Sequence, residues 1–297
     1  MTDFVGALEI GGTHVTAARV DIATRAVEAN TMRRIDFEPT AAHDTLLAAI
    51  REAARSAARD DIRSWGVAVP GPFDYERGVC TIEGVAKLDA LRGVDLRAEI
   101  AAAARADGRQ VLFLNDADAF LLGEWWAGAA RDRPVAMGVT LGTGLGSAFL
   151  KDGELLSAGQ GVPPDARLDL IPYRDAPVED VISARGIVAA YRRAGGDQVV
   201  SAKEIAGRAR RRDPKARAVY REFGAALGEF LAPHVAAFEP TALVFGGSIA
   251  RSWRLFSDDF RATCPPASVL AFYGIAEHLS QAPLVGAAHH VTRTTTR

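Results

Sequence analysis

Residues 7–18 read ALEIGGTHVTAA, and residues 139–150 read VTLGTGLGSAFL. Each stretch is a β-prone apolar run, a turn of glycine and threonine, and a second β-prone run, which is the pattern of a strand–turn–strand unit. The copies lie about 130 residues apart, a spacing too long for a solenoid with a short period. The repetition therefore predicts an α/β protein made of duplicated domains.

The rest of the chain alternates short apolar runs with helical patterns. No clear linker separates the two halves, so we predict two lobes with a cleft between them, the usual place for a small-molecule site. We place residues 1–118 plus 283–297 in an N-terminal lobe and 119–282 in a C-terminal lobe. Residues 158–178, rich in Pro, Asp and Gly, indicate a loop. Strands are expected at 4–10, 15–20, 64–69, 111–114, 135–141, 146–150 and 241–245, and helices at 42–58, 96–105, 117–130, 179–193, 202–211, 216–238 and 283–292.

Composition excludes several classes of protein. The chain has 297 residues, of which 48% are hydrophobic and 24% charged, as in globular proteins. A net charge of −2 gives no reason to expect nucleic acid or an anionic membrane as a partner. No apolar run approaches the ~18 residues of a membrane span, and the first residues lack a signal-peptide pattern. The two cysteines form no metal or disulfide motif. We expect a cytoplasmic protein.

Three glycine turns are candidate phosphate-binding sites. Glycine lets backbone N–H groups approach a phosphate, and a neighbouring hydroxyl adds a donor. A plain hairpin turn is the alternative for each, and matched copies weigh against it. A dinucleotide-binding fingerprint is excluded, since Ser147 stands where its last glycine would lie. The last turn precedes an expected helix, whose N-terminus favours anions. The turns are Gly11-Gly12-Thr13, Gly142-Thr143-Gly144 and Gly246-Gly247-Ser248.

A carboxylate supplies the candidate catalytic group. Asp116 and its neighbour Asn115 follow an expected strand, where ligands bind in open α/β sheets. Asp116 would accept a proton from a substrate hydroxyl, with a helix N-cap as the alternative role. Asp118 is a second candidate for that cap, which would leave Asp116 free for chemistry.

Three further polar residues are candidate ligands. Glu9 lies in an apolar strand, and we read it as a water-mediated Mg²⁺ ligand or a solvent-facing strand end. His14 follows the first turn, and it would contact a phosphate or be structural. Glu179 would be a ligand or cap a helix near Val181.

Six segments, in order along the chain, resemble motifs of the ROK family of sugar kinases and sugar-responsive repressors. Residues 8–14 resemble its first phosphate motif, usually D-x-G-G-T-K, and residues 114–118 resemble N-D-A-N. No single motif is decisive, but six in the correct order are specific. The others are 67–72, similar to G-V-P-G-P; 141–146, similar to the second phosphate motif; 178–183, similar to L-E-x-x-x-S; and 244–248, similar to the strand and turn of the adenosine pocket.

The resemblance implies a two-lobed, actin-like (ribonuclease H-like) ATPase fold that binds ATP and Mg²⁺, with a sugar in the cleft. It implies that Asp116 is the catalytic base and that the three glycine turns hold the nucleotide. Gly71, Asn115 and Glu179 would hold the sugar. Lobe closure and a homodimer are further implications.

Several residues depart from the family pattern. Most family kinases carry an E-x-G-H sugar motif and a cysteine-rich zinc loop, but residues 163–177 contain neither Cys nor His. Pro164 and Arg167 stand near the missing Glu and His, so we predict no zinc and an unusual sugar contact by Arg167. His14 replaces a Lys, and Lys87 stands where an Asn is common. With the first turn at Gly11, we expect no DNA-binding domain.

The sequence thus predicts a glucokinase-like enzyme that transfers the γ-phosphoryl group of ATP to a hydroxyl of a hexose or hexose derivative. Two alternatives stay open. One is a sugar-binding regulator of the same fold with little or no catalysis, suggested by the missing E-x-G-H motif. The other is a sugar kinase that uses polyphosphate as donor.

Overall fold

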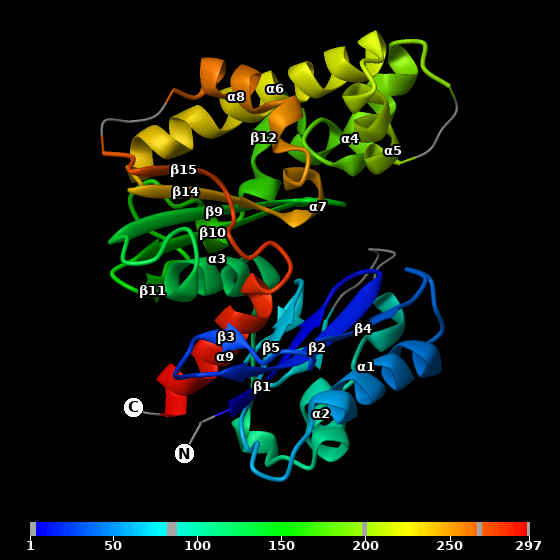
Figure 1. The fold of residues 1–297 in the computed structure, drawn as a ribbon, viewed down its shortest axis with the longest axis vertical. Helices are drawn as coiled ribbons and strands as arrows, with labels where there is room; N and C mark the ends of the chain where they lie inside the picture. Colours follow the sequence, from blue (N-terminus) through cyan, green and yellow to red (C-terminus); the bar gives the residue numbers. More distant parts are fainter. Residues whose placement is uncertain (1–3, 82–87, 198–200, 266–268, 296–297) are drawn as a thin grey trace. The chain divides into compact units, whose positions relative to one another are not determined.

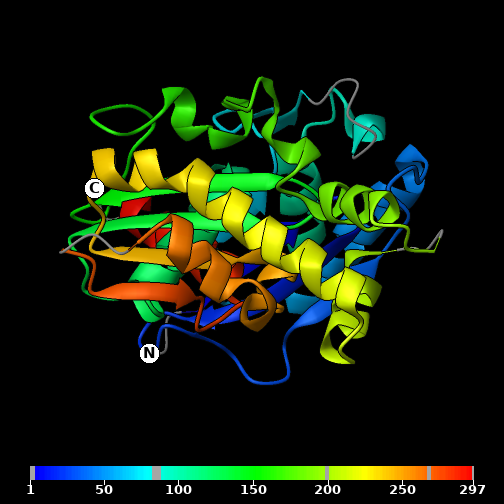
Figure 2. The same cartoon turned by 90° about the horizontal axis from the view of Figure 1, so that it is seen from above.

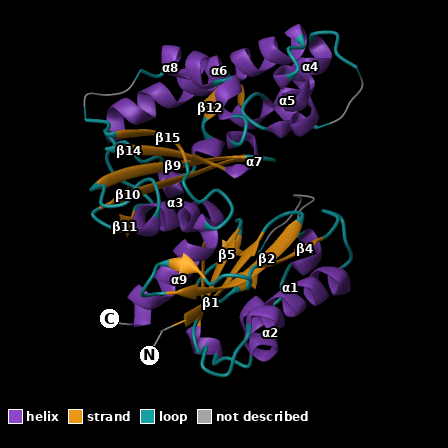
Figure 3. Ribbon diagram, in the orientation of Figure 1, coloured by secondary structure: helices purple, strands orange, loops and turns teal. Residues whose placement is uncertain are grey.

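The computed structural model describes residues 4–81, 88–197, 201–265 and 269–295. Contacts divide the chain into two compact units: unit 1 holds residues 1–131 and 280–297, and unit 2 holds residues 132–279. The sequence pattern places the lobe boundaries after residues 118 and 282, whereas the helix over 116–127 groups with unit 1. Figure 1 traces the chain by colour, and Figure 3 shows helices and strands.

Unit 1 is built on one mixed β-sheet. Its strand order is β3-β2-β1-β5-β8, and β4 also pairs with β2. Strand β1 is antiparallel to β2 and parallel to β5, which is parallel to β8. The carboxyl ends of β1, β5 and β8 therefore meet at one edge. The bounds are β1 Phe4–Ile10, β2 His14–Asp21, β3 Ala26–Val27, β4 Arg33–Asp36, β5 Trp65–Val69 and β8 Val111–Asn115, with a small hairpin of β6 Phe73–Asp74 and β7 Val79–Cys80.

Helices cover both faces of this sheet because its strands are apolar on both sides. Helices α1 (His43–Ala57) and α2 (Leu96–Ala104) pack on the face that carries Leu8 and Ile10. Helix α9 (Ala282–Thr295) and the end of α3 (Asp116–Ala127) pack on the opposite face, with Val5 and Ala7. Successive residues of a strand point to opposite faces, so Glu9 lies on the α3/α9 face.

Unit 2 repeats the topology of unit 1. Its strand order is β11-β10-β9-β14-β15, in which β9 is antiparallel to β10 and parallel to β14, and β14 is parallel to β15. Each strand thus matches one in the sheet of unit 1, and the predicted duplication is confirmed. The bounds are β9 Val135–Leu141, β10 Leu145–Lys151, β11 Glu154–Leu155, β14 Ala242–Gly246 and β15 Phe272–Ile275.

A long helix, α6 (Pro214–Phe238), crosses one face of the unit 2 sheet (Figure 2). Its buried side chains share a core with alternate residues of β9, β10 and β14. Asp213 caps its start by accepting a hydrogen bond from the backbone N–H of Ala216 at 2.7 Å. The remaining helices are α4 Ala184–Arg193, α5 Ala202–Arg210, α7 Gly247–Ala250 and α8 Ser257–Thr263.

Some expected elements have other bounds or forms. The helix expected over 179–193 begins only at Ala184, because Ser183 caps it through the N–H of Gly186. The loop at 158–178 contains short 3₁₀ turns and the hairpin of β12 (Pro172–Tyr173) and β13 (Ala176–Pro177). Strands β4 and β15 and helix α8 carry no strong local pattern, so the sequence does not predict them. Within the described ranges, no helix is long and apolar enough to span a membrane.

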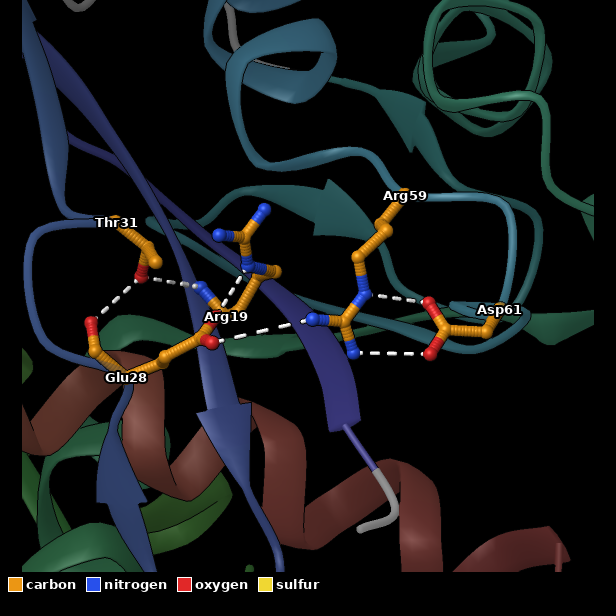
Figure 4. A network of polar contacts seen from close by, with 5 residues as sticks. All are labelled: Arg19, Glu28, Thr31, Arg59 and Asp61. Atoms are coloured by element: carbon orange, nitrogen blue, oxygen red, sulfur yellow. Dashed lines mark hydrogen bonds and ion pairs between the residues drawn. The ribbon is translucent and has the colours of Figure 1, made fainter. Parts of the chain in front are cut away.

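A polar network ties two loops of unit 1 to strand β2 (Figure 4). The Glu28 carboxylate accepts a hydrogen bond from Arg19 and lies 3.9 Å from Arg59, which in turn bonds Asp61. The Thr31 hydroxyl accepts from the N–H of Arg19 and donates to the carbonyl of Glu28. Exposed ion pairs such as Arg59–Asp61 contribute little stability, whereas Arg19 and Glu28 are partly buried.

Candidate active site

Carboxylates gather at the edge where β1, β5 and β8 end. Glu9 of β1 pairs in register with Ala68 of β5, and the next residue, Val69, pairs with Asn115 at the end of β8. Asp116 follows directly as the first residue of α3. Register therefore brings Glu9 and Asp116 to the same edge from distant parts of the sequence. This is where an α/β sheet binds ligands.

A row of polar side chains crosses the sheet beside Asp116. Glu9 pairs with Thr16 of β2, and Thr16 pairs with Arg34 of β4. Burial, reinforced by the negative charge of Asp116, raises the pKa of Glu9 to about 7, while Arg34 acts in the opposite direction. The Glu9 and Asp116 carboxylates thus interact where water is largely excluded, and Arg34 is close enough to offset part of their charge. The sequence does not mark Arg34, because only the β2–β4 register brings it there.

Asp118, on the first turn of α3, adds a third acid. Burial, reinforced by Asp116, raises its pKa to about 7. Asp118 does not cap α3, contrary to the expectation from the sequence. Asn115 does so, because its Oδ1 accepts from the N–H of Ala117 at 2.9 Å, and Asp116 Oδ1 lies 3.0 Å from the same N–H. The capping alternative thus applies mainly to Asn115.

The other end of the Asn115 amide is tied to Tyr75. Asn115 Nδ2 donates to the Tyr75 hydroxyl at 3.2 Å, and this hydroxyl donates to the carbonyl of Val69 at 3.3 Å. A Cβ on Gly71 would lie 3.3 Å from the same hydroxyl. Gly71 and Asn115, both predicted to hold substrate, therefore share Tyr75 as a neighbour. No local pattern in the sequence marks Tyr75.

The first glycine turn joins β1 to β2. It is closed by the N–H of Gly11, which donates to the carbonyl of His14 at 2.8 Å, and the His14 ring lies over Gly11. Burial, with help from the positive charge of Arg34, lowers the pKa of His14, while Asp36 acts in the opposite direction. Among the described residues, the N–H groups of Gly12 and Thr13 have no hydrogen-bond partner. The turn thus offers neutral donors to an anion.

The second glycine turn lies in unit 2 beside the third. Strand β14 pairs with β9 up to Gly246 and Thr140, which places the Gly246–Ser248 turn next to the end of β9. Gly247 has a φ of 82°, and a Cβ there would lie 2.3 Å from the Leu141 carbonyl, so only glycine fits. The following helix, α7, has only four residues, so the expected helix-dipole contribution is small.

Glu179 joins this group. Its Oε1 accepts from the N–H of Leu145 at 3.0 Å, and its Oε2 lies 3.6 Å from the Arg185 guanidinium. Of the two alternatives for Glu179, the capping role does not apply, because Glu179 lies in the 3₁₀ turn over Val178–Asp180 and Ser183 caps the following helix.

Arg167 is held within its own loop. Its guanidinium bonds both oxygens of Asp169, and the loop is fastened to β10 by Ser147, whose hydroxyl donates to the Ala166 carbonyl and accepts from the N–H of Leu168. A sugar would have to bind this ion pair rather than a free arginine. Lys87 lies outside the described residues.

The residues near Asp116 suit a magnesium ion. Mg²⁺ binds through one or two carboxylates, waters and substrate phosphates. Glu9 and Asp116 are two such groups, and a cation would relieve their repulsion. In the described part of the chain, no group of three or more His, Cys, Asp or Glu could hold a metal ion by itself.

Comparisons with known proteins identify the fold and the family. A ROK family glucokinase from Streptomyces griseus, solved with glucose and AMPPNP, matches with a TM-score of 0.79 over 98% of this chain and 100% of that chain, at 23% identity. The likeness shows the actin-like α/β fold. The ROK family profile matches residues 5–293, and the chain belongs to this family.

Curated relatives carry two activities in their names. Glucokinase of Thermotoga maritima is 28% identical over 242 residues, or 74% of each chain. N-acetyl-D-glucosamine kinase of Pectobacterium carotovorum is 30% identical over 205 residues, covering 62% of this chain and 64% of the relative. Both relatives are named as kinases of hexoses or their derivatives.

Proposed function

We propose that this chain is a sugar kinase that transfers the γ-phosphoryl group of ATP to a hydroxyl of a hexose or hexose derivative. The observation that carries the proposal is Asp116, at the carboxyl edge of the unit 1 sheet beside Glu9. Membership of the ROK family and relatives named as glucokinase and N-acetyl-D-glucosamine kinase support it.

Asp116 is the proposed general base. It would accept the proton of the attacking sugar hydroxyl, and Asn115 and Gly71 would hold the sugar beside it. Tyr75 fixes the side chain of Asn115, so the amide is oriented before substrate binds. Arg167 and Glu179 remain proposed sugar contacts, the first through its pair with Asp169.

The glycine turns are the proposed phosphate sites. Phosphoryl transfer depends mainly on positioning and on stabilising charge, and backbone N–H groups do both without a lysine. Gly12, Thr13, Thr143 and Gly144 supply the donors, and Gly246–Ser248 would support the nucleotide. Glu9 would hold Mg²⁺ through water, and the ion, when bound, offsets phosphate charge.

The proposed enzyme is cytoplasmic, forms a homodimer and acts without nucleic acid. A cytoplasmic location follows from the proposed use of ATP, and a homodimer follows from the family resemblance alone. The net charge of −2 supports a function without nucleic acid.

The test is ADP release from Mg-ATP with a panel of hexoses, amino sugars and N-acetylated sugars, for the wild type and Asp116→Asn. Sugar-dependent ADP release that is lost in the variant would support the proposal and name the substrate class. Polyphosphate in place of ATP tests the other donor. Saturable sugar binding without turnover from either donor would instead favour a binding protein that has lost the reaction.

A further inference from the structure

The second glycine turn is braced from outside its hairpin by a carboxylate. Glu179 Oε1 accepts the backbone N–H of Leu145, the first residue of β10, at 3.0 Å. A Cβ on Gly144 would lie only 2.2 Å from this oxygen. The carboxylate therefore fills the space that glycine leaves open at residue 144.

The segment that carries Glu179 is itself anchored to the turn and to α4. The N–H of Ala184 donates to the carbonyl of Gly142 at 2.9 Å. The Ser183 hydroxyl donates to the Glu179 carbonyl and accepts from the N–H of Gly186 at 3.2 Å. The turn is thus attached at both its ends to one rigid helix start.

These bonds determine which donors of the turn face outward. The N–H of Gly142 is used within the turn, where it donates to the carbonyl of Gly144, and the N–H of Leu145 is used by Glu179. In the described residues, the N–H groups of Thr143 and Gly144 have no hydrogen-bond partner, and Thr143 is exposed. The brace leaves two adjacent donors at the tip of the turn.

Arg185 offsets the charge of this brace. A carboxylate next to a phosphate site would repel the ligand. The Arg185 guanidinium lies 3.6 Å from Glu179 Oε2 and 3.1 Å from the carboxylate of Asp180. Glu179 can therefore brace the turn while its outer oxygen is paired.

We propose that Glu179 is a positioning residue for the second phosphate turn, holding Thr143 and Gly144 with their N–H groups toward the nucleotide phosphates. This rests on the proposed function, because it assumes that the turn binds a nucleotide. If Glu179 were only a sugar contact, its replacement would change neither the turn nor the nucleotide affinity measured in the absence of sugar.

The test uses the full chain without sugar. Backbone amide hydrogen exchange of residues 142–145 and binding of Mg-AMPPNP by calorimetry are measured for wild type, Glu179→Ala and Glu179→Gln. The Ala variant loses the acceptor, so the Leu145 amide should exchange at least about tenfold faster and nucleotide affinity should fall by about tenfold or more. The Gln variant keeps an oxygen acceptor and should restore both to within about threefold.

Asp180→Asn is the matched control, because Asp180 shares Arg185 but, among the described contacts, makes no bond to the turn. It should behave as wild type. Gly144→Ala offers an independent route, since its methyl group displaces Glu179. Its effect should be less than additive with Glu179→Ala.

An unchanged Leu145 amide in Glu179→Ala, or unchanged nucleotide affinity with a raised sugar KM, would overturn the proposal. A wild type that binds no nucleotide would contradict the proposed donor, and with it the assignment of a nucleotide-positioning role. If the wild type binds no nucleotide but its Leu145 amide is protected by Glu179, the role of Glu179 is only to stabilise the turn.

Discussion

Asp116 illustrates what single residues contribute to this site. Its position after an apolar strand is visible in the sequence. Its neighbour Glu9 is more than 100 residues away along the chain and reaches the same sheet edge only through strand pairing. The raised pKa of Glu9 arises because burial and Asp116 both disfavour its charged form. A pair of buried acids in which ionisation of one disfavours ionisation of the other is typical of functional sites.

Tyr75 is the residue whose role is tested most simply. Tyr75→Phe removes the acceptor for Asn115 Nδ2 and the donor to Val69. We expect a several-fold higher sugar KM, a nearly unchanged ATP KM, and a loss of about 1 kcal/mol in the free energy of unfolding.

Steady-state kinetics and urea unfolding check this expectation. Phe73→Leu, a neighbour of Tyr75 without a hydroxyl, is the control for altered packing. A sugar KM equal to that of the wild type in Tyr75→Phe would show that the Asn115 amide needs no such support.

The limit of sequence reasoning at this scale is physical. Asn115, Asp116 and the glycine turns carry local signals, namely a strand end and a turn composition. Tyr75 and Arg34 carry none, because the chain path after Val69 and the β2–β4 register bring them to the site. Arg167 pairs with Asp169, which is only two residues away in the sequence. An acid this close to a candidate arginine ligand indicates that the arginine is paired within the protein.

Among the elements, α3 and α9 approach each other closely through glycines. A Cβ on Gly286 would lie 1.9 Å from the carbonyl oxygen of Ala119, and one on Gly123 would lie 2.0 Å from that of Ala282. Backbone atoms cannot move aside as flexible side chains do. Since α3 begins at Asp116, this contact also fixes the start of the helix that carries the proposed base.

Gly286→Ala is therefore expected to destabilise unit 1 by about 1–3 kcal/mol through overpacking. Gly108→Ala is the control, because the nearest atom to its Cβ would be 3.9 Å away. Urea unfolding followed by tryptophan fluorescence, to which Trp126 at this contact contributes, measures both variants. Equal midpoints for the two variants would mean that α9 shifts without cost.

His289 of α9 gives this contact a pH dependence. Its ring stacks on Trp126 with centroids 4.6 Å apart, and neither ring nitrogen has a hydrogen-bond partner among the described residues. Burial first, and then the nearby cations Arg293 and Arg25, lower its pKa to about 4. In the unfolded chain the pKa is about 6.5.

Between pH 6.5 and 4 the unfolded state binds more protons at this residue, so stability is lost as the pH falls through this window. His289→Phe keeps an aromatic ring and cannot be protonated. We expect its free energy of unfolding to fall less than that of the wild type between pH 7 and pH 5. Parallel profiles for His289→Phe and the wild type would refute the assignment.

Element prediction succeeds where the local pattern is strong. Strands β1 and β9 have the predicted bounds. The ends of helices α1, α5 and α6 each lie within two residues of the ends predicted for that helix. The sequence does not predict strand β15, because only four residues, at the edge of its sheet, form it. The helix expected at 179–193 is too long because Glu179 and Asp180 resemble capping residues, while Ser183 makes the cap.

For the whole molecule, the internal echo predicts the architecture. The matching strand orders of units 1 and 2 follow from two copies of one unit, which the sequence shows only at the glycine turns. Even these turns differ in length, because the first closes between Gly11 and His14 and the second between Gly142 and Gly144. The two units therefore share a strand topology although their sequences are visibly similar only at the glycine turns.

The most direct test of the proposed kinase is transfer of isotope-labelled γ-phosphate from ATP to sugar, with the sugar phosphate quantified by mass spectrometry for wild type and Asp116→Asn. A kinase with Asp116 as its base should form one labelled sugar phosphate per ADP in the wild type, and kcat should be at least ~10²-fold lower in the variant, the usual scale of a general base. Near-normal turnover in Asp116→Asn, or ADP without labelled sugar phosphate, would contradict it.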